Sequence, residues 1–131
     1  MIPYLYPYTK TLIMNRILTS LILILAVCAL NAQGIEGSWT GKITIPQGEL
    51  SINFHISASD DGYTSTMDSP DQGAMGIPVD STLYVEPELT IKMPAIDFVY
   101  NGTLTGSDEI KGTMTQFGQT LELNLTRMEE E

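Results

Sequence analysis

The sequence has 131 residues, enough for one domain, and a formal net charge of −10 at pH 7. All 16 acidic residues lie in residues 33–131 against four basic ones, so this part carries a formal charge of −12. Such an acidic surface repels phosphate backbones and anionic lipids, which argues against nucleic-acid binding and peripheral membrane attachment.

The first part of the chain predicts export. From Met14 the sequence MNRILTSLILILAVCALNAQ has one basic residue, then an apolar block, then small residues. This is the layout of a secretory signal peptide. We therefore predict that residues 1–32 are a signal peptide with its true start at Met14, cleaved after Ala32, and that the protein is periplasmic or extracellular. An uncleaved membrane anchor is the alternative.

The single cysteine, Cys28, raises the possibility of a lipoprotein. It follows Leu25, Ala26 and Val27, but valine is bulky for the residue before a lipidated cysteine, so lipid attachment is the less favoured alternative. Cleavage after Ala32 would leave no thiol for a disulfide, a nucleophile or a metal site.

From residue 33 onward, apolar and polar residues alternate with a period of two. In ELSINFHIS, for example, Leu50, Ile52, Phe54 and Ile56 share one face and the polar residues share the other, as in a half-buried antiparallel strand. Gly, Pro, Asp or Asn bound each such segment. The predicted strands are residues 39–45, 49–57, 62–67, 81–86, 88–94, 98–105, 109–116 and 119–127.

Short strands with hairpin-length gaps predict an all-β protein, a small antiparallel up-and-down β-barrel of about eight strands. Gly41, Gly102 and Gly112 lie inside strands, where a small barrel needs close approach of the backbone. No helical period of useful length and no internal repeat compete with this interpretation.

The first and last strands would be neighbours in a closed barrel. Trp39 in GSW and Arg127 both lie on the apolar side of their strands, so the guanidinium can cover the indole and close that end. The alternative is that Arg127 is a solvated terminal charge. A GxW in the first strand and an Arg in the last resemble the lipocalin-like (calycin) barrels.

The segment TMDSPDQGAMGIPV, residues 66–79, is dense in Asp, Pro and Gly, and we interpret it as the longest loop of the chain. We expect it to cover an apolar mouth of the barrel as an Ω-type lid and to form the binding face. The candidate binding residues are Asp68, Asp71, Gln72, Met75 and Ile77.

A second resemblance covers residues 36–127. The order of GSWTGKI, LSINFHI, the DSPDQGA stretch, YNGTLTG and IKGTMTQFGQTLELNLTR is similar to the N-terminal β-domain of secreted bacterial α/β-hydrolases. Met114 departs from that pattern, which often has an aromatic residue there. The resemblance implies an accessory barrel without the catalytic domain and supplies no catalytic residues.

Direct signs of chemistry are weak. There is no GxSxG elbow, and a set of Ser69, His55 and Asp71 lacks any indicated oxyanion donors. Asp68, Asp71 and Asp80 surround a turn in the manner of calcium ligands, but Asp also serves simply to stabilise turns. We therefore predict no catalytic residues, no metal and no cofactor.

The sequence thus predicts a non-catalytic exported accessory or binding module, associated with a secreted hydrolase or an envelope component. One alternative is a carrier of a small apolar ligand, although large inward residues such as Phe54 and Tyr100 argue against a roomy cavity. Another is part of a hydrolase whose catalytic domain is absent here.

Overall fold

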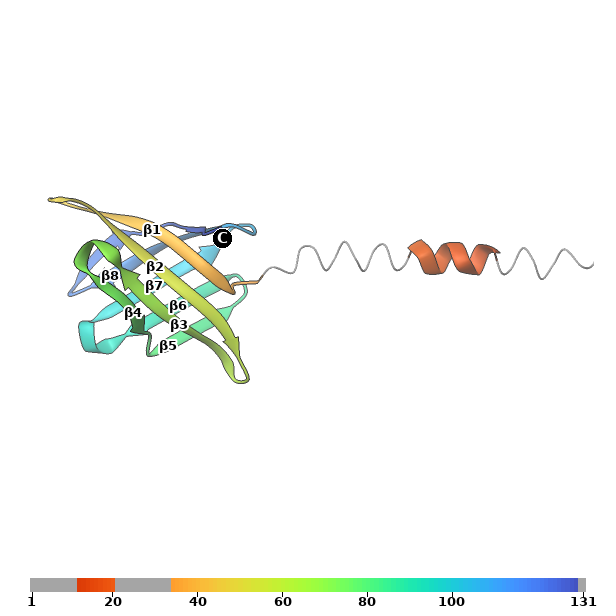
Figure 1. The fold of residues 1–131 in the computed structure, drawn as a ribbon, viewed down its shortest axis with the longest axis horizontal. Coiled ribbons are helices and arrows are strands. Elements are labelled where there is room, and N and C mark those ends of the chain that lie inside the picture. The colour runs from red at the N-terminus through yellow and green to blue at the C-terminus, as the bar shows by residue number, and fades with distance from the viewer. Residues whose placement is uncertain (1–11, 21–33, 130–131) are drawn as a thin grey trace, which may run out of the picture. The chain divides into compact units, whose positions relative to one another are not determined.

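The computed structural model describes residues 12–20 and 34–129 of the chain (Figure 1). These stretches belong to two separate compact units, which divide between Gln33 and Gly34. Residues 12–20 form a helix. The predicted cleavage site at Ala32 and the cysteine at position 28 lie outside the described residues. Among the helices that the structure describes, none combines the length and apolar character needed to cross a membrane.

Residues 34–129 fold into short antiparallel strands joined by tight turns and two 3-10 helices. The strands are β1 (Gly37–Ile45), β2 (Gly48–Ser59), β3 (Gly62–Ser69), β4 (Ala74–Pro78), β5 (Ser81–Val85), β6 (Glu88–Met93), β7 (Phe98–Leu104), β8 (Glu109–Gln116), β9 (Gln119–Glu122) and β10 (Leu125–Arg127). The 3-10 helices are η1 (Pro70–Gln72) and η2 (Pro94–Ile96).

Eight of these strands close into a barrel, in the order β1-β2-β3-β5-β6-β7-β8-β10. Closure comes from β10, which pairs with β8 on one side and with β1 on the other. The remaining two strands flank the ring, since β4 pairs with β3 and β9 pairs with β8. Figure 1 shows the strands wrapping around a common axis. The predicted all-β fold, an antiparallel barrel of about eight strands, is confirmed.

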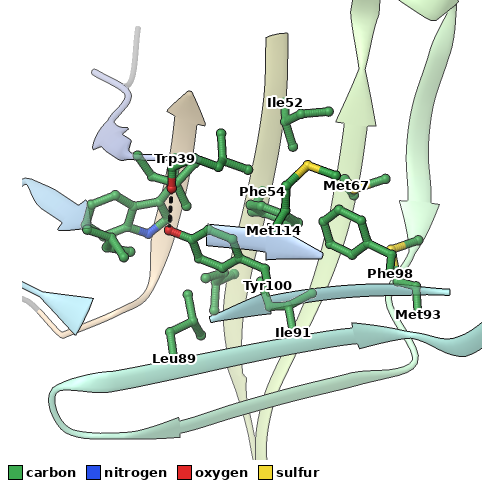
Figure 2. Close-up of a cluster of buried hydrophobic side chains, with 14 of the residues drawn as sticks. Trp39, Ile52, Phe54, Met67, Leu89, Ile91, Met93, Phe98, Tyr100 and Met114 are labelled. Atoms are coloured by element: carbon green, nitrogen blue, oxygen red, sulfur yellow. Dashed lines mark hydrogen bonds between the residues drawn. The ribbon is translucent and has the colours of Figure 1, made fainter. Parts of the chain in front are cut away.

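The alternating residues place one apolar set inside the barrel. Phe54 lies at the centre, with its ring centroid 5.6 Å from that of Tyr100 and 6.3 Å from that of Phe98. Figure 2 shows these rings between Trp39 toward one end and Met67 and Met93 toward the other. The middle of the barrel is therefore filled by side chains.

Two glycines let the strands approach closely around Tyr100. Gly102 and Gly112 face each other across β7 and β8, and a Cβ on either would meet the Tyr100 side chain. The Tyr100 hydroxyl donates a 3.0 Å hydrogen bond to the carbonyl of Leu123, the dashed line in Figure 2. Burial raises the pKa of Tyr100 well above its usual value, which keeps this donor protonated.

One end of the barrel is closed by the first and last strands. Trp39 is fully buried and pairs in register with Arg127, whose guanidinium carbon lies 4.3 Å from the centre of the indole ring. The guanidinium also donates hydrogen bonds to the carbonyls of Gly34, Glu36 and Ser107. The expected contact between these two side chains is therefore present, and we call this end, around Trp39, the closed end.

The expectation of a long loop at residues 66–79 is wrong. Residues 66–69 complete β3, η1 makes one turn, and β4 follows directly from Ala74. The interruption between β3 and β4 is short because Pro70 begins the 3-10 turn and Gly73 ends it with a left-handed φ of 69°. Pro78 is tolerated because β4 pairs only with β3 and has a free outer edge among the described residues. The segment therefore consists of the end of β3, one 3-10 turn and a strand that flanks β3, and not of an Ω loop.

Candidate functional site

A cavity of about 340 Å³ lies inside the barrel at the end opposite the closed end. We call it the mouth cavity. It forms where β1 ends, β2 begins, β8 turns into β9, and η1 and η2 cap the adjoining strands. Its lining residues are Ile43, Ile45, Leu50, Ile52, Met67, Ser69, Gln72, Ala74, Ile77, Ile96, Phe98, Met114, Gln116, Phe117, Gln119 and Leu121.

The mouth cavity is apolar in its depth and polar at its edge. Its buried lining residues are apolar except Ser69, whose hydroxyl donates a 2.7 Å hydrogen bond to Oε1 of Gln72. Gln72 and Gln119 are exposed. Met67 and Met114 contribute flexible, polarisable side chains that adapt to differently shaped apolar groups. An apolar pocket with a few polar groups is the usual form of a small-molecule site.

Two exposed apolar residues at the rim were missed by sequence reasoning. Phe117 is 74% exposed, and Ile96 is 36% exposed. Phe117 adopts a φ of 49° in the two-residue turn between β8 and β9, a left-handed conformation that is rare for bulky residues. A two-residue turn of this kind favours Asn or Asp before Gly, but the sequence QFGQ has Phe at that position. This unusual residue was the signal that the sequence offered.

The five predicted binding residues do not share one face. Gln72 and Ile77 line the mouth cavity. Asp71 lies beside it and accepts a 2.7 Å hydrogen bond from the amide of Ser51, which fixes η1 to β2. Met75 is 64% exposed and does not line the cavity. Asp68 belongs to a different cluster on the outside of the barrel.

That cluster is a chain of hydrogen bonds across β1, β2 and β3. The hydroxyl of Ser38 lies 2.7 Å from Nδ1 of His55, and Nε2 of His55 lies 2.7 Å from Oδ2 of Asp68. The other carboxylate oxygen of Asp68 accepts a 2.7 Å hydrogen bond from the amide of Gly76 in β4. The cluster therefore joins four neighbouring strands.

The environment of Asp68 keeps its carboxylate ionised. Burial by itself would raise the pKa of Asp68, but the hydrogen bond from the Gly76 amide and the contacts with His55 outweigh it, so the pKa lies below its usual value. The ionised carboxylate of Asp68 can accept a hydrogen bond from Nε2–H of His55. In the neutral imidazole with its proton on Nε2, Nδ1 is then the acceptor for the Ser38 hydroxyl.

We expect Asp68→Asn to lower the free energy of unfolding by about 1 to 3 kcal/mol at pH 7, because it removes a buried acceptor from this chain. The folded pKa of Asp68 lies below its unfolded value of 3.8. Its contribution is thus complete above the unfolded pKa and is lost as the pH falls through the folded pKa. Urea melts from pH 7 to pH 3 should show the gap between the two proteins narrowing with acid.

The matched control for this prediction is Asp80→Asn, which makes the same chemical change at an exposed position. Its stability should differ from that of the parent by less than about 0.5 kcal/mol at pH 7. A gap for Asp68→Asn that stays constant down to pH 3 would contradict the role given to the carboxylate.

The cluster differs from the set considered from the sequence, because His55 contacts Ser38 and Asp68 instead of Ser69 and Asp71. A shallow groove of about 550 Å³ runs beside Ser38 and His55. Among the described residues, the Ser38 hydroxyl forms a hydrogen bond only with His55. Acyl transfer would require, in addition, hydrogen-bond donors that stabilise the oxyanion. Asp71 and Asp80 do not join Asp68, and the described residues contain no group of three or more metal-ligating side chains.

In comparisons with known proteins, the chain matches no family model, no curated protein and no solved structure.

Proposed function

We propose that this barrel is a binding module that takes an apolar ligand into the mouth cavity. The observation that carries the proposal is the contrast between the two halves of the interior. The middle of the barrel is filled by Phe54, Tyr100 and Trp39, whereas the opposite end keeps a cavity of about 340 Å³ lined mainly by apolar side chains. Such a volume lies at the small end of the range of roughly 300 to 1,000 Å³ found for ligand pockets.

Strain at the rim supports the same proposal. Phe117 keeps a left-handed backbone and an exposed ring at the edge of the cavity, although both features cost free energy in the unliganded protein. A ligand in the mouth cavity would cover part of this ring and of Ile96, which offsets that cost. The rigid, closed barrel holds these side chains in place.

A second candidate function is the accessory role that the sequence predicts, in which the barrel docks onto a secreted hydrolase or an envelope component after export. The exposed apolar side chains of Phe117 and Ile96 favour it, because a partner could insert an apolar side chain between them. The two functions use the same end of the barrel.

We expect residues 34–131 to bind octanol, and we expect Ala74→Phe to weaken that binding at least about tenfold. Ala74 lines the mouth cavity and is half-buried, so a phenyl ring there occupies the space that the ligand needs. The measurement is titration followed by NMR of methionine methyl groups. Met67 and Met114 line the cavity and should shift, whereas the exposed Met75 should not.

Two further variants control this experiment. Ala58→Phe adds the same ring at an exposed position of β2 away from the mouth cavity and should leave the affinity unchanged. Phe117→Asn should weaken binding while the fold is retained or stabilised, because Asn accepts the left-handed turn conformation. Octanol that binds Ala74→Phe as tightly as the parent would show that the mouth cavity is not the site.

A further inference from the structure

We infer that the ligand of the mouth cavity is uncharged, with an apolar chain inside the cavity and a hydroxyl, ester or amide group at its rim. This inference rests on the proposed function and names the chemical class of its ligand. It rests on the uncharged lining, on the positions of the basic and acidic residues around it, and on the amide side chains at the rim.

Among the residues that the structure describes, no charged residue lines the mouth cavity. Its buried walls include Ile43, Ile52, Phe98 and Met114, none of which can compensate a buried charge. An ion moved from water into such surroundings loses its hydration without gaining a partner. A charged group of the ligand is therefore disfavoured within the cavity itself.

None of the basic residues described in the barrel lines the mouth cavity. Arg127 covers Trp39 at the closed end. Lys42 lies 3.8 Å from Glu49, and Lys111 lies 3.7 Å from Glu109. Lys92 is exposed on β6 and is not part of the lining. Within residues 34–129, no cation thus lines the cavity to receive the carboxylate of a fatty acid, which would need one at the rim.

The acidic residues next to the rim do not form a cation site either. Asp71 adjoins the lining residue Gln72, but its Oδ2 already accepts the Ser51 amide, and Asp97 adjoins Ile96 and Phe98 without lining the cavity. Both are exposed. They repel an anionic head, and because they are solvated, their attraction for an ammonium group is screened.

What the rim does offer is neutral hydrogen-bonding groups. Gln72 is fixed by the hydroxyl of Ser69, and Gln116 donates a 3.0 Å hydrogen bond to the carbonyl of Ile96. Gln119 is exposed beside them. Amide side chains both donate and accept hydrogen bonds, as a hydroxyl, ester or amide head requires. The rim therefore fits a neutral polar head.

The experiment compares octanol, octanoate and octylamine at pH 7.5 by calorimetry, with the methionine methyl shifts of Met67 and Met114 reporting the site. These probes share one apolar chain and differ in the charge of the head group. We expect octanol to bind about tenfold or more tightly than either ion. Equal or tighter binding of octanoate or octylamine in the cavity would overturn the inference and leave the proposed function standing. Failure of all three to bind would overturn both.

A charge placed at the rim gives a second, independent readout. Gln72→Lys should raise the affinity for octanoate about tenfold relative to the parent, because it supplies the missing cation. The matched control is Gln47→Lys, which makes the same change at an exposed residue between β1 and β2 that does not line the cavity. An equal gain in both variants would show that net charge, and not the charge of the rim, controls selection.

Discussion

Gly112→Ala is expected to destabilise the barrel by about 3 kcal/mol or more and to leave little folded protein at moderate temperature. A Cβ at this position would overlap the backbone carbonyl of Asn101 and crowd the hydroxyl of Tyr100. Backbone in the centre of a closed sheet cannot move aside as a flexible side chain can. The loss should appear as a lower free energy of unfolding in urea, followed by circular dichroism.

The matched control is Gly34→Ala, the same substitution at the start of the described domain, where a Cβ would meet no atom within 4 Å. We expect its stability to stay within about 0.5 kcal/mol of the parent. Similar melts for the two variants would mean that β7 and β8 need no close approach at the Gly102–Gly112 pair.

Arg127→Ala is expected to lower the free energy of unfolding by about 2 to 3 kcal/mol, because it removes both a cation–π contact and several charge-assisted hydrogen bonds. The side chain of Arg127 is 18% exposed, so the contact with Trp39 is largely desolvated. Removal of the guanidinium also leaves the carbonyls of Gly34, Glu36 and Ser107 without this donor. Urea melts monitored by the fluorescence of the single Trp39 measure the change.

Lys92→Ala is the control for the charge, since Lys92 is an exposed basic residue of β6. It should change the stability by less than about 0.5 kcal/mol. Arg127→Lys keeps the charge but not the planar group that forms several hydrogen bonds, and it should fall between the two. An Arg127→Ala variant as stable as Lys92→Ala would mean that the closed end is held by apolar packing alone.

The two ends of the barrel therefore have different physical characters. The closed end is fixed by Trp39, Arg127 and the carbonyls around them. The mouth cavity, by contrast, keeps space and exposed apolar surface at Phe117. In the proposed function, the closed end is the scaffold and the mouth cavity is the recognition site.

Most of the fold could be predicted from the sequence, because a two-residue period and turn residues are local signals. The eight predicted segments each correspond to a strand, and the last one divides into β9 and β10. The exception is β4. Its sequence, AMGIP, carries Gly and Pro and follows DSPDQG, so its composition indicated a loop. Only the neighbouring β3 and the free outer edge of β4 make these residues acceptable in a strand.

The candidate site could be predicted only in part. Sequence reasoning selected Gln72 and Ile77, which line the mouth cavity, but grouped them with Asp68 and Met75, which do not. Asp68 and Ile77 differ in place because alternate residues of neighbouring strands point to opposite sides of the wall. The contacts among Ser38, His55 and Asp68 depend on strand register. Ser38 stands opposite His55, whereas Asp68 stands opposite Asn53 and reaches His55 diagonally, and a one-residue change of register would separate these side chains.

From the sequence alone one can derive every strand except β4, the inward apolar face and the pairing of Trp39 with Arg127, since each follows from local periodicity and from the closure of a barrel. Which end of the barrel stays open is known only from the folded structure. That outcome depends on where Phe117, Ile96 and Gln72 meet after the strands tilt and close, and on whether Phe54 and Phe98 fill the space between the walls. Such packing brings together residues that are far apart in the chain, so no local sequence pattern predicts it.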